Sequence, residues 1–308
     1  MPEIERVRGI ELLEFKSRFE LPEVPVVIEG GCAHYRAANL WTAAYLKQRL
    51  GHEQIEFKLS TTHQHPNFHA KTVPEMFARG SSTLAQFLDD VTTGEPSERA
   101  RRYFTGDERF LLKRRDGRDT RDEALAPLLD DVEVPALLPA ERLYTVWGWL
   151  SGRGVRTWLH YETNGCHNFN AQLAGEKTCV LYPPEQLSRM RLFKPGAGNP
   201  AYNCSEIDVE DPAEQALLAA AHGLTATLRA GDLLFIPAWW FHTFFHLGEL
   251  NANVNFWYKP ERPSLCQVAV RQGFLDAMLA TGFSEKNASP AQAELLARVE
   301  QAIVTRPV

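Results

Sequence analysis

The feature that most constrains the fold is the segment 143–259, in which short strand-like runs follow one another between turn residues. The runs read LYTVWGWL, VRTWLHYE, FNAQLAGEKTCVLYPP, LTATL, DLLFIP, HTFFHL and NANVNFWY. Runs rich in Val, Thr, Tyr, Phe and Trp that are bounded by Gly, Pro or Asn are typical of strands. Roughly eight strands in succession favour a barrel or a jelly roll. We therefore predict a mainly β core in this part of the chain.

Mixed patterns lie on either side of this core. Residues 36–50 and 83–91 carry apolar side chains at helical intervals, whereas residues 25–29 and 54–59 are strand-like. After Pro260 two apolar helical stripes follow. We divide the chain into a mixed α/β region packed on the barrel (1–141), the β core (142–260) and a helical region (261–308). Apolar stripes left in water would be an exposed patch, so the last region is a candidate dimerisation element of a homodimer.

Charge and cysteine content restrict the compartment and the partners. The chain of 308 residues has 33 Lys and Arg against 39 Asp and Glu, a formal charge of −6, which makes nucleic acid an unexpected partner. The basic stretch 99–121 is interspersed with acids and is interpreted as a solvated face. The first residues lack the order of a secretory signal, and no apolar run is long enough to cross a membrane. Five scattered cysteines without a CxxC pair favour a reduced, cytoplasmic setting without structural zinc.

Three side chains suggest a metal site. His160 and Glu162 are two residues apart in a strand-like run, so they leave the same face of a sheet, and His242 follows 82 residues later in another such run. Two histidines and one carboxylate with open positions form the facial triad of non-haem Fe(II) oxygenases. By spacing alone, however, a chance HxE pair and a core histidine remain the better explanation.

The surrounding motifs change these odds. TWLHYE, NFNAQLAGEK, LYPPEQ, GDLLFIP before His242, and VNFWYK recur in that order, and PVVIEGG with LWTAAYLKQRLG precede them. This arrangement resembles the JmjC-type, cupin-like 2-oxoglutarate oxygenases, and among them most closely the asparaginyl hydroxylases that inhibit hypoxia-inducible factor. The resemblance covers nearly the whole chain and is strongest over 144–259. It implies a double-stranded β-helix, the cupin/JmjC jelly roll, with flanking helices.

The resemblance also implies roles for eight residues. His160, Glu162 and His242 would bind Fe(II), and Lys177 with Thr157 would bind the distal carboxylate of the co-substrate 2-oxoglutarate. The remaining matches near the co-substrate and the metal are Asn168, Asn255 and Trp257; each could equally be a structural side chain of the barrel. The implied activity is that of a dioxygenase that uses O2 to hydroxylate a C–H bond, most readily on a peptide or protein side chain. The alternatives are a small molecule, a free amino acid, an RNA base, or a catalytically silent metal-binding protein.

This sequence departs from the family pattern at three places. Glu162 stands where the family has aspartate, and two extra residues follow it near Cys166 and His167. The family tyrosine that binds 2-oxoglutarate aligns near Leu111, which leaves Tyr103 or Tyr144 to replace it. Thr157, three residues before His160, would lie on the opposite face of a regular strand, so we expect a twist or bulge there.

Two further clusters are given structural interpretations. His63, His65 and His69 lie in THQHPNFH, where Pro and Asn indicate a substrate-facing loop rather than a second metal site. Trp239, Trp240 and Phe241 are expected mainly to pack in the barrel, with one ring at most lining the pocket.

Overall fold

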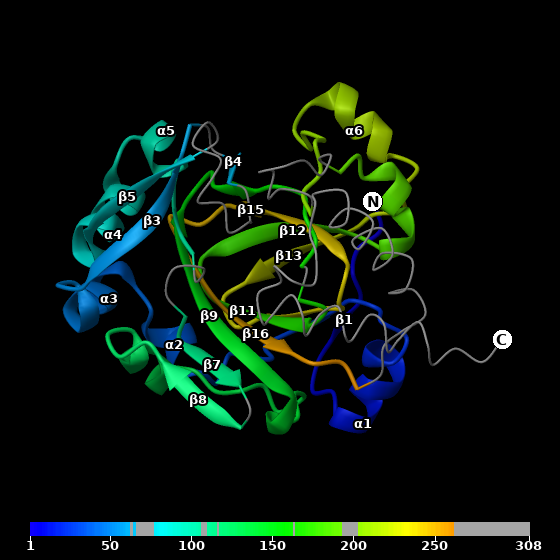
Figure 1. The fold of residues 1–308 in the computed structure, drawn as a ribbon, viewed down its shortest axis with the longest axis horizontal. Coiled ribbons are helices and arrows are strands. Elements are labelled where there is room, and N and C mark those ends of the chain that lie inside the picture. Colours follow the sequence, from blue (N-terminus) through cyan, green and yellow to red (C-terminus); the bar gives the residue numbers. More distant parts are fainter. Residues whose placement is uncertain are drawn as a thin grey trace, which may run out of the picture.

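The polypeptide folds into two facing β-sheets with helices on the outside of the larger one (Figure 1). This computed structural model describes residues 1–61, 64–65, 77–105, 110–115, 117–162, 164–192 and 203–261. Between Leu143 and Tyr258 it contains eight strands, β9 to β16. The predicted mainly β jelly roll with a minority of helices is therefore confirmed.

Eleven strands form the larger sheet, in the order β1-β2-β14-β11-β16-β9-β6-β3-β5, with the β7–β8 hairpin added beside β9. Their bounds are β1 (Arg6–Val7), β2 (Val26–Ile28), β3 (Gln54–Ser60), β5 (Phe77–Thr83), β6 (Arg102–Phe104), β7 (Leu112–Arg115), β8 (Arg118–Arg121), β9 (Leu143–Gly152), β11 (His167–Ala174), β14 (Leu233–Ile236) and β16 (Leu250–Tyr258). The strands of this sheet that precede residue 143 thus add to central strands that come from the predicted β core.

Five strands form the smaller sheet, in the order β13-β12-β15-β10-β4. Their bounds are β4 (Gln64–His65), β10 (Arg156–Thr157), β12 (Glu176–Tyr182), β13 (Leu224–Arg229) and β15 (Phe241–His246). The expected loop at 62–69 is therefore wrong at Gln64 and His65, whose backbone pairs in parallel with β10. His63 and His69 lie outside the described residues.

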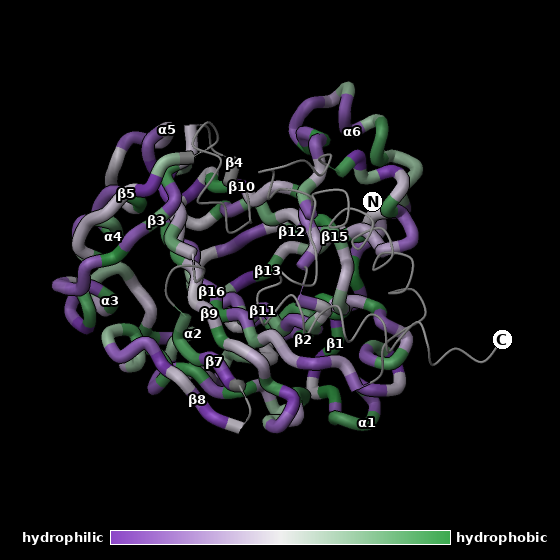
Figure 2. Tube along the Cα trace, in the orientation of Figure 1, coloured by the Kyte–Doolittle hydropathy of each residue, from purple (hydrophilic) through white to green (hydrophobic). Residues whose placement is uncertain are grey.

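Side-chain alternation along β11 shows how the sheet divides two environments. Phe169, Ala171 and Leu173 join the largest apolar cluster, which also contains Phe15 and Phe235. The residues between them, Asn168, Asn170 and Gln172, are equally buried but polar. Successive strand residues face opposite sides, so the outer face of the sheet packs under the helices and the inner face is polar. Figure 2 shows hydrophilic residues on the inner strands of the molecule.

Gly175 carries the chain from the larger sheet to the smaller one. It is the single residue between β11 and β12, and its φ of +74° lies in the left-handed region. A Cβ at this position would lie 2.2 Å from the carbonyl oxygen of Leu250. Only glycine fits both requirements, and the turn places β12 opposite β11.

The helices lie before and between the strands. Their bounds are α1 (Leu12–Phe15), which continues as the π-turn η1 (Lys16–Glu20), α2 (Arg36–Leu40), α3 (Ala43–Leu50), α4 (Leu84–Thr93), α5 (Pro96–Arg99), α6 (Pro212–Leu218), and the 3-10 turns η2 (Ala126–Asp131), η3 (Ala140–Arg142) and η4 (Pro184–Arg189).

The helix expected over residues 36–50 is in fact two. Trp41 leaves the helical conformation with ψ of 84°, and Thr42 caps the second helix by accepting a hydrogen bond from the Tyr45 backbone N–H. The Trp41 indole turns inward and donates to the buried Asp131 carboxylate at 3.2 Å. Thr42 is a residue type that strongly prefers the N-cap of a helix, and it starts a new helix here although the apolar periodicity continues through it.

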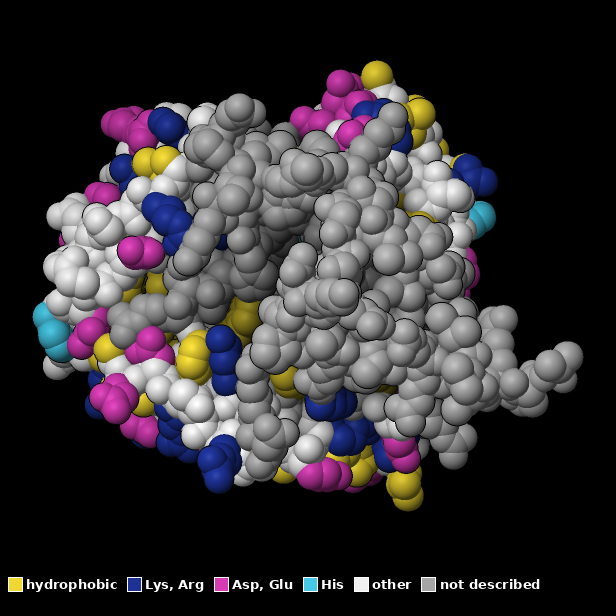
Figure 3. Space-filling view, in the orientation of Figure 1, with side chains coloured by type: hydrophobic (Ala, Val, Ile, Leu, Met, Phe, Trp, Pro, Cys, Tyr) yellow, Lys and Arg dark blue, Asp and Glu magenta, His cyan; other side chains and the backbone are white. Residues whose placement is uncertain are grey.

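Arginines of the basic stretch pair with neighbouring acids, as the mixed signs predicted. Arg114 makes two hydrogen bonds to Asp119 across the β7–β8 hairpin, and Arg101 and Arg102 both bind Glu98. The hairpin is hydrophilic (Figure 2), and in Figure 3 basic and acidic side chains are interspersed on the coloured part of the visible face.

The C-terminal region 262–308 and its proposed dimer contact lie outside the described residues. In the described part of the chain, no helix has the length and apolar character that a membrane span needs.

Candidate metal centre

The backbone brings His160 and His242 together. The His160 N–H donates to the His242 carbonyl oxygen at 3.1 Å, and the His242 N–H donates back at 2.7 Å. This isolated antiparallel bridge lies beyond the end of β10, where β10 pairs with β15 through Arg156 and Phe245. Between the two pairs, three residues of one chain segment (157–159) lie opposite two of the other (243–244). Segment 157–159 therefore contains one extra residue, a β-bulge, as was expected from the position of Thr157 in the sequence.

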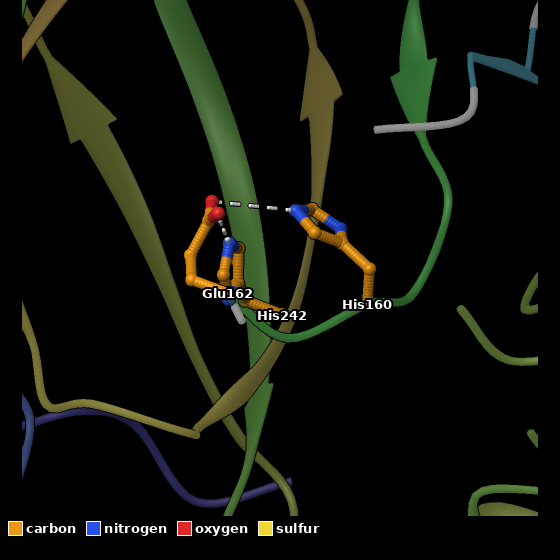
Figure 4. Close-up of side chains that lie close together, drawn as sticks. All are labelled: His160, Glu162 and His242. Atoms are coloured by element: carbon orange, nitrogen blue, oxygen red, sulfur yellow. Dashed lines mark ion pairs between the residues drawn. The ribbon is translucent and has the colours of Figure 1, made fainter. Parts of the chain in front are cut away.

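Glu162 completes a cluster of three ligand atoms. Its Oε1 lies 3.8 Å from Nε2 of His160 and 3.9 Å from Nε2 of His242, and one ligand atom from each residue lies within 4.8 Å of the others. Figure 4 shows the carboxylate and the two imidazoles pointing toward one another. These separations are too long for hydrogen bonds, which require about 3 Å. A small inward movement would bring all three atoms onto one ion.

Hydrogen bonds to the backbone fix which ring nitrogen of each histidine is available. Nδ1 of His160 lies 2.7 Å from the Trp158 carbonyl oxygen, and Nδ1 of His242 lies 2.9 Å from that of Trp240. A carbonyl oxygen can only accept, so both Nδ1 atoms carry a hydrogen and donate. When the imidazole is neutral, Nε2 then keeps its lone pair, and it faces Glu162. Metal-binding histidines are commonly oriented in this way by their second nitrogen.

Burial keeps His242 neutral. Burial, and to a lesser degree the neighbouring His160, lower the pKa of this imidazole to about 3. A neutral imidazole is the form that coordinates a metal. A donor set of two imidazoles and one carboxylate fits a divalent transition metal, whereas hard Mg²⁺ and Ca²⁺ prefer oxygen ligands only.

A cavity between the two sheets adjoins these residues. From the smaller sheet it is lined by Thr157, Lys177, Phe244 and His246. From the larger sheet it is lined by Tyr103, Trp149, Asn170, Asn253 and Asn255. His160, Glu162 and His242 form one part of its wall, so a molecule in the cavity could contact both these candidate ligands and the polar side chains beyond them.

Lys177 is the cation of this cavity. It is 1% exposed, its Nζ donates to Asn170 Oδ1 at 2.9 Å, and it lies 4.5 Å from the centre of the Phe244 ring. Burial lowers its pKa to about 7. Among the described residues no carboxylate forms an ion pair with it. The site therefore maintains a costly cation that an incoming carboxylate would stabilise.

The other residues implied by the resemblance divide into two groups. Thr157 and Asn255 line the cavity, and Thr157 Oγ1 also accepts the Phe244 backbone N–H at 2.9 Å. Asn168 and Trp257 are paired across β11 and β16 in the buried interior, but they do not line the cavity. Asn168 Oδ1 and the Trp257 indole nitrogen are buried and have no hydrogen-bond partner among the residues that the structure describes.

Tyr103, rather than Tyr144, occupies the cavity. It lies on β6, opposite Ser151 of β9, and its ring stacks on Trp149 at 5.7 Å. Leu111 packs instead in the apolar cluster on the outer face of the sheet, beside Gly148. Of the two substitutes considered for the family tyrosine, the structure thus places Tyr103 in the site.

The extra residues after Glu162 do not add a ligand. His167 begins β11, its Nδ1 accepts the Ala238 backbone N–H at 3.0 Å, and its ring packs against Phe235 and Tyr258. It therefore faces the outer side of the sheet. Cys166 is buried in a compact turn in which its N–H donates to Asn164.

The aromatic residues at 239–241 are all buried in apolar clusters and do not line the cavity: Trp239, Trp240 and Phe241. This agrees with the packing role expected for them. The aromatic residue of this segment that does line it is Phe244.

Five of the described cavity residues were not singled out from the sequence: Trp149, Asn170, Asn253, Phe244 and His246. The signal that could have found the two asparagines is the period of two in NFNAQ and NANVN, which places polar residues on one face of a strand. The same period along HTFFH aligns Phe244 and His246 with His242.

The chain is similar in sequence to several known proteins. Residues 12–263 match the family described as the cupin-like domain. The chain is 27% identical over 275 residues to tRNA wybutosine-synthesizing protein 5 of Homo sapiens, which covers 85% of this chain and 79% of that protein. It is also 27% identical over 272 residues to Lysine-specific demethylase JMJ31 of Arabidopsis thaliana, covering 80% of this chain and 48% of the demethylase. A third match, 29% identical over 268 residues, is to tRNA wybutosine-synthesizing protein 4 of Gibberella zeae, covering 80% of this chain and 23% of that protein.

Proposed function

The chain belongs to the cupin-like domain family, and from this membership and the geometry of its site we propose that it is an Fe(II)- and 2-oxoglutarate-dependent oxygenase. The observation that carries the proposal is the convergence of His160, Glu162 and His242 beside a cavity that also holds the buried Lys177. A purely structural histidine pair would not need an adjacent buried cation.

Each residue has a definite task in this proposal. His160, Glu162 and His242 would hold Fe(II), which with 2-oxoglutarate and O2 supplies an oxidant able to attack a C–H bond, with succinate and carbon dioxide as by-products. Lys177 would bind the far carboxylate of 2-oxoglutarate and keep its proton there, because a paired carboxylate favours the charged amine. Tyr103 and Thr157 border the same cavity, and their hydroxyl groups would donate to that carboxylate.

The burial of the site supports such chemistry. His160, His242 and Lys177 are each at most 3% exposed, whereas the Glu162 side chain is 21% exposed. Fixed side chains then replace bulk water around the co-substrate, which strengthens the electrostatic interactions that orient it. A substrate would approach from the side of Glu162.

We place a peptide or protein side chain first as the substrate. Residues of the JmjC pattern, the net charge of −6 and a relative named as a lysine demethylase support it. Hydroxylation of an asparagine in particular rests on the motif resemblance alone. A base in RNA is the second candidate, since two relatives named for wybutosine synthesis in tRNA align with 85% and 80% of this chain.

Succinate formation tests the activity, and mass spectrometry tests the substrate. The purified chain is incubated with Fe(II), 2-oxoglutarate and either a peptide library or total tRNA, and the products are searched for a gain of one oxygen. We expect metal-dependent succinate that is lost in His160→Ala and His242→Ala. Absence of both succinate and Fe(II) binding in the folded wild-type protein would refute the proposal.

A further inference from the structure

We propose that His246 is a second binding group for the far carboxylate of 2-oxoglutarate, held in position by Ser151 and acting opposite Lys177. The inference rests on the proposed function and deepens it, because it assigns how this chain recognises a dicarboxylate.

The pairing of β12 with β15 puts His246 next to Lys177. The two residues are direct partners in the antiparallel register, and both side chains line the cavity. Directly opposed residues on one face of a sheet have Cβ atoms about 5 Å apart. His246 is 3% exposed and Lys177 1%, so neither side chain relies on bulk water. One carboxylate in the cavity can therefore reach both.

Two buried hydrogen-bond donors that face the same cavity favour a ligand that can accept from both. The charged form of Lys177 adds to this preference, because burial opposes its charge. The carboxylate among the described lining residues is Glu162, which faces the two histidine ligands instead. The arrangement becomes favourable once the ligand itself supplies a negative charge between Lys177 and His246.

Ser151 fixes the orientation of the His246 ring. Its Oγ and Nδ1 of His246 are hydrogen-bonded, and the Tyr103 ring stands edge-on to the imidazole at 5.6 Å. The His246 backbone is also held, because its N–H donates to Val155 and its carbonyl oxygen accepts from Gly154. A serine hydroxyl that donates to Nδ1 leaves the imidazole proton on Nε2, which makes Nε2–H a hydrogen-bond donor. Ser151 is thus a positioning residue.

A ligand without the far carboxylate separates this role from a structural one. 2-Oxopentanoate has the same chain length and keto acid end as 2-oxoglutarate but lacks the second carboxylate. Binding of each compound is measured by isothermal titration calorimetry to the Mn(II)-loaded protein in the absence of oxygen. We compare the wild type with His246→Gln, Ser151→Ala and the control His52→Gln at an exposed histidine.

We expect His246→Gln to weaken 2-oxoglutarate by about tenfold or more, the usual effect of losing a hydrogen bond to a charged group, while 2-oxopentanoate changes less than about twofold. Ser151→Ala should weaken 2-oxoglutarate by a smaller factor, and His52→Gln should bind like the wild type. If His246→Gln is poorly folded, the Ser151→Ala comparison of the two ligands decides.

Two results would overturn the inference. Equal losses for both ligands would show that His246 supports the fold alone, and unchanged 2-oxoglutarate affinity would show that it does not touch the carboxylate. A wild-type protein that binds Mn(II) but neither keto acid would instead refute the proposed function, and with it the inference.

Discussion

Replacing Lys177 by methionine should make the protein more stable while it loses its co-substrate. Methionine is unbranched and close to lysine in length, so it can occupy the position of the Lys177 side chain beside Asn170 and Phe244 without the charge. The lysine pKa of about 7, against 10.5 for the free side chain, measures how strongly the folded site resists the cation.

The magnitude follows from this difference in pKa. At about 1.4 kcal/mol per pKa unit, keeping Lys177 buried costs about 4 kcal/mol at pH 7. The substitution removes that cost, but it leaves Asn170 Oδ1 without its donor, which costs about 1–3 kcal/mol. The net expectation is a gain of about 2 kcal/mol, or about 4 °C in melting temperature for a chain of this size.

The pH dependence provides an internal check on the cause. Between pH 7 and 10.5 the unfolded chain holds the Lys177 proton and the folded chain does not. The free energy of unfolding of the wild type therefore rises with pH across this window. The gain shown by Lys177→Met should shrink in parallel, vanish at about pH 9, where the lysine cost equals that of the lost Asn170 hydrogen bond, and reverse at higher pH.

Urea unfolding at several pH values measures the stability, and calorimetry with 2-oxoglutarate measures the binding. Lys259→Met, at an exposed lysine, is the matched control and should change neither. A Lys177→Met variant that is less stable than the wild type at pH 7, or that binds 2-oxoglutarate with unchanged affinity, would refute the reasoning about burial and charge.

The remaining predictions concern three other residues. Glu162→Asp should keep the fold but lose much of the metal-dependent succinate formation, because it withdraws the carboxylate by one methylene from nitrogens already 3.8 and 3.9 Å away; native turnover by Glu162→Ala would show that the ligand set is misassigned. Tyr103→Phe should raise the KM for 2-oxoglutarate while the melting temperature stays the same, since the stacking on Trp149 is kept; an unchanged KM would exclude the hydroxyl from the site. His167, whose pKa burial lowers to about 3, takes up a proton on unfolding between pH 6.5 and 3, so stability is lost as pH falls through this range, and urea melts of His167→Gln should show a shallower loss.

The sequence predicted the strands well, and it predicted the convergence of His160, Glu162 and His242 for an incomplete reason. Alternation along a regular strand was the argument for placing His160 and Glu162 together, yet both lie beyond the end of β10. Their ligand atoms converge because the bulge at 157–159 turns the chain and the bridge to His242 holds it. The ordered motifs of the family carried information on this geometry that the spacing of two residues did not.

Tyr103 shows what local patterns cannot supply. It lies 40 residues before β9 begins, and only the pairing of β6 with β9 brings it into the cavity. Pairing between distant strands depends on the packing of the whole sheet, so no local period marks such a residue. The period of two in the sequences of β11 and β16, by contrast, is a local signal from which the inward polar face could have been identified.

The order of strands in the larger sheet also determines when the sheet can form during synthesis. Val26 pairs with Phe235, so β2 meets β14 only after 209 further residues have left the ribosome. Until then the N-terminal strands lack this neighbour, and a nascent chain shorter than about 240 residues cannot close its sheet. Contacts so distant along the chain slow folding and leave strand edges exposed to aggregation in the meantime. A chain truncated before this point would therefore expose unpaired strand edges and be prone to aggregation. A chaperone that covers the N-terminal strands would protect the chain during this period.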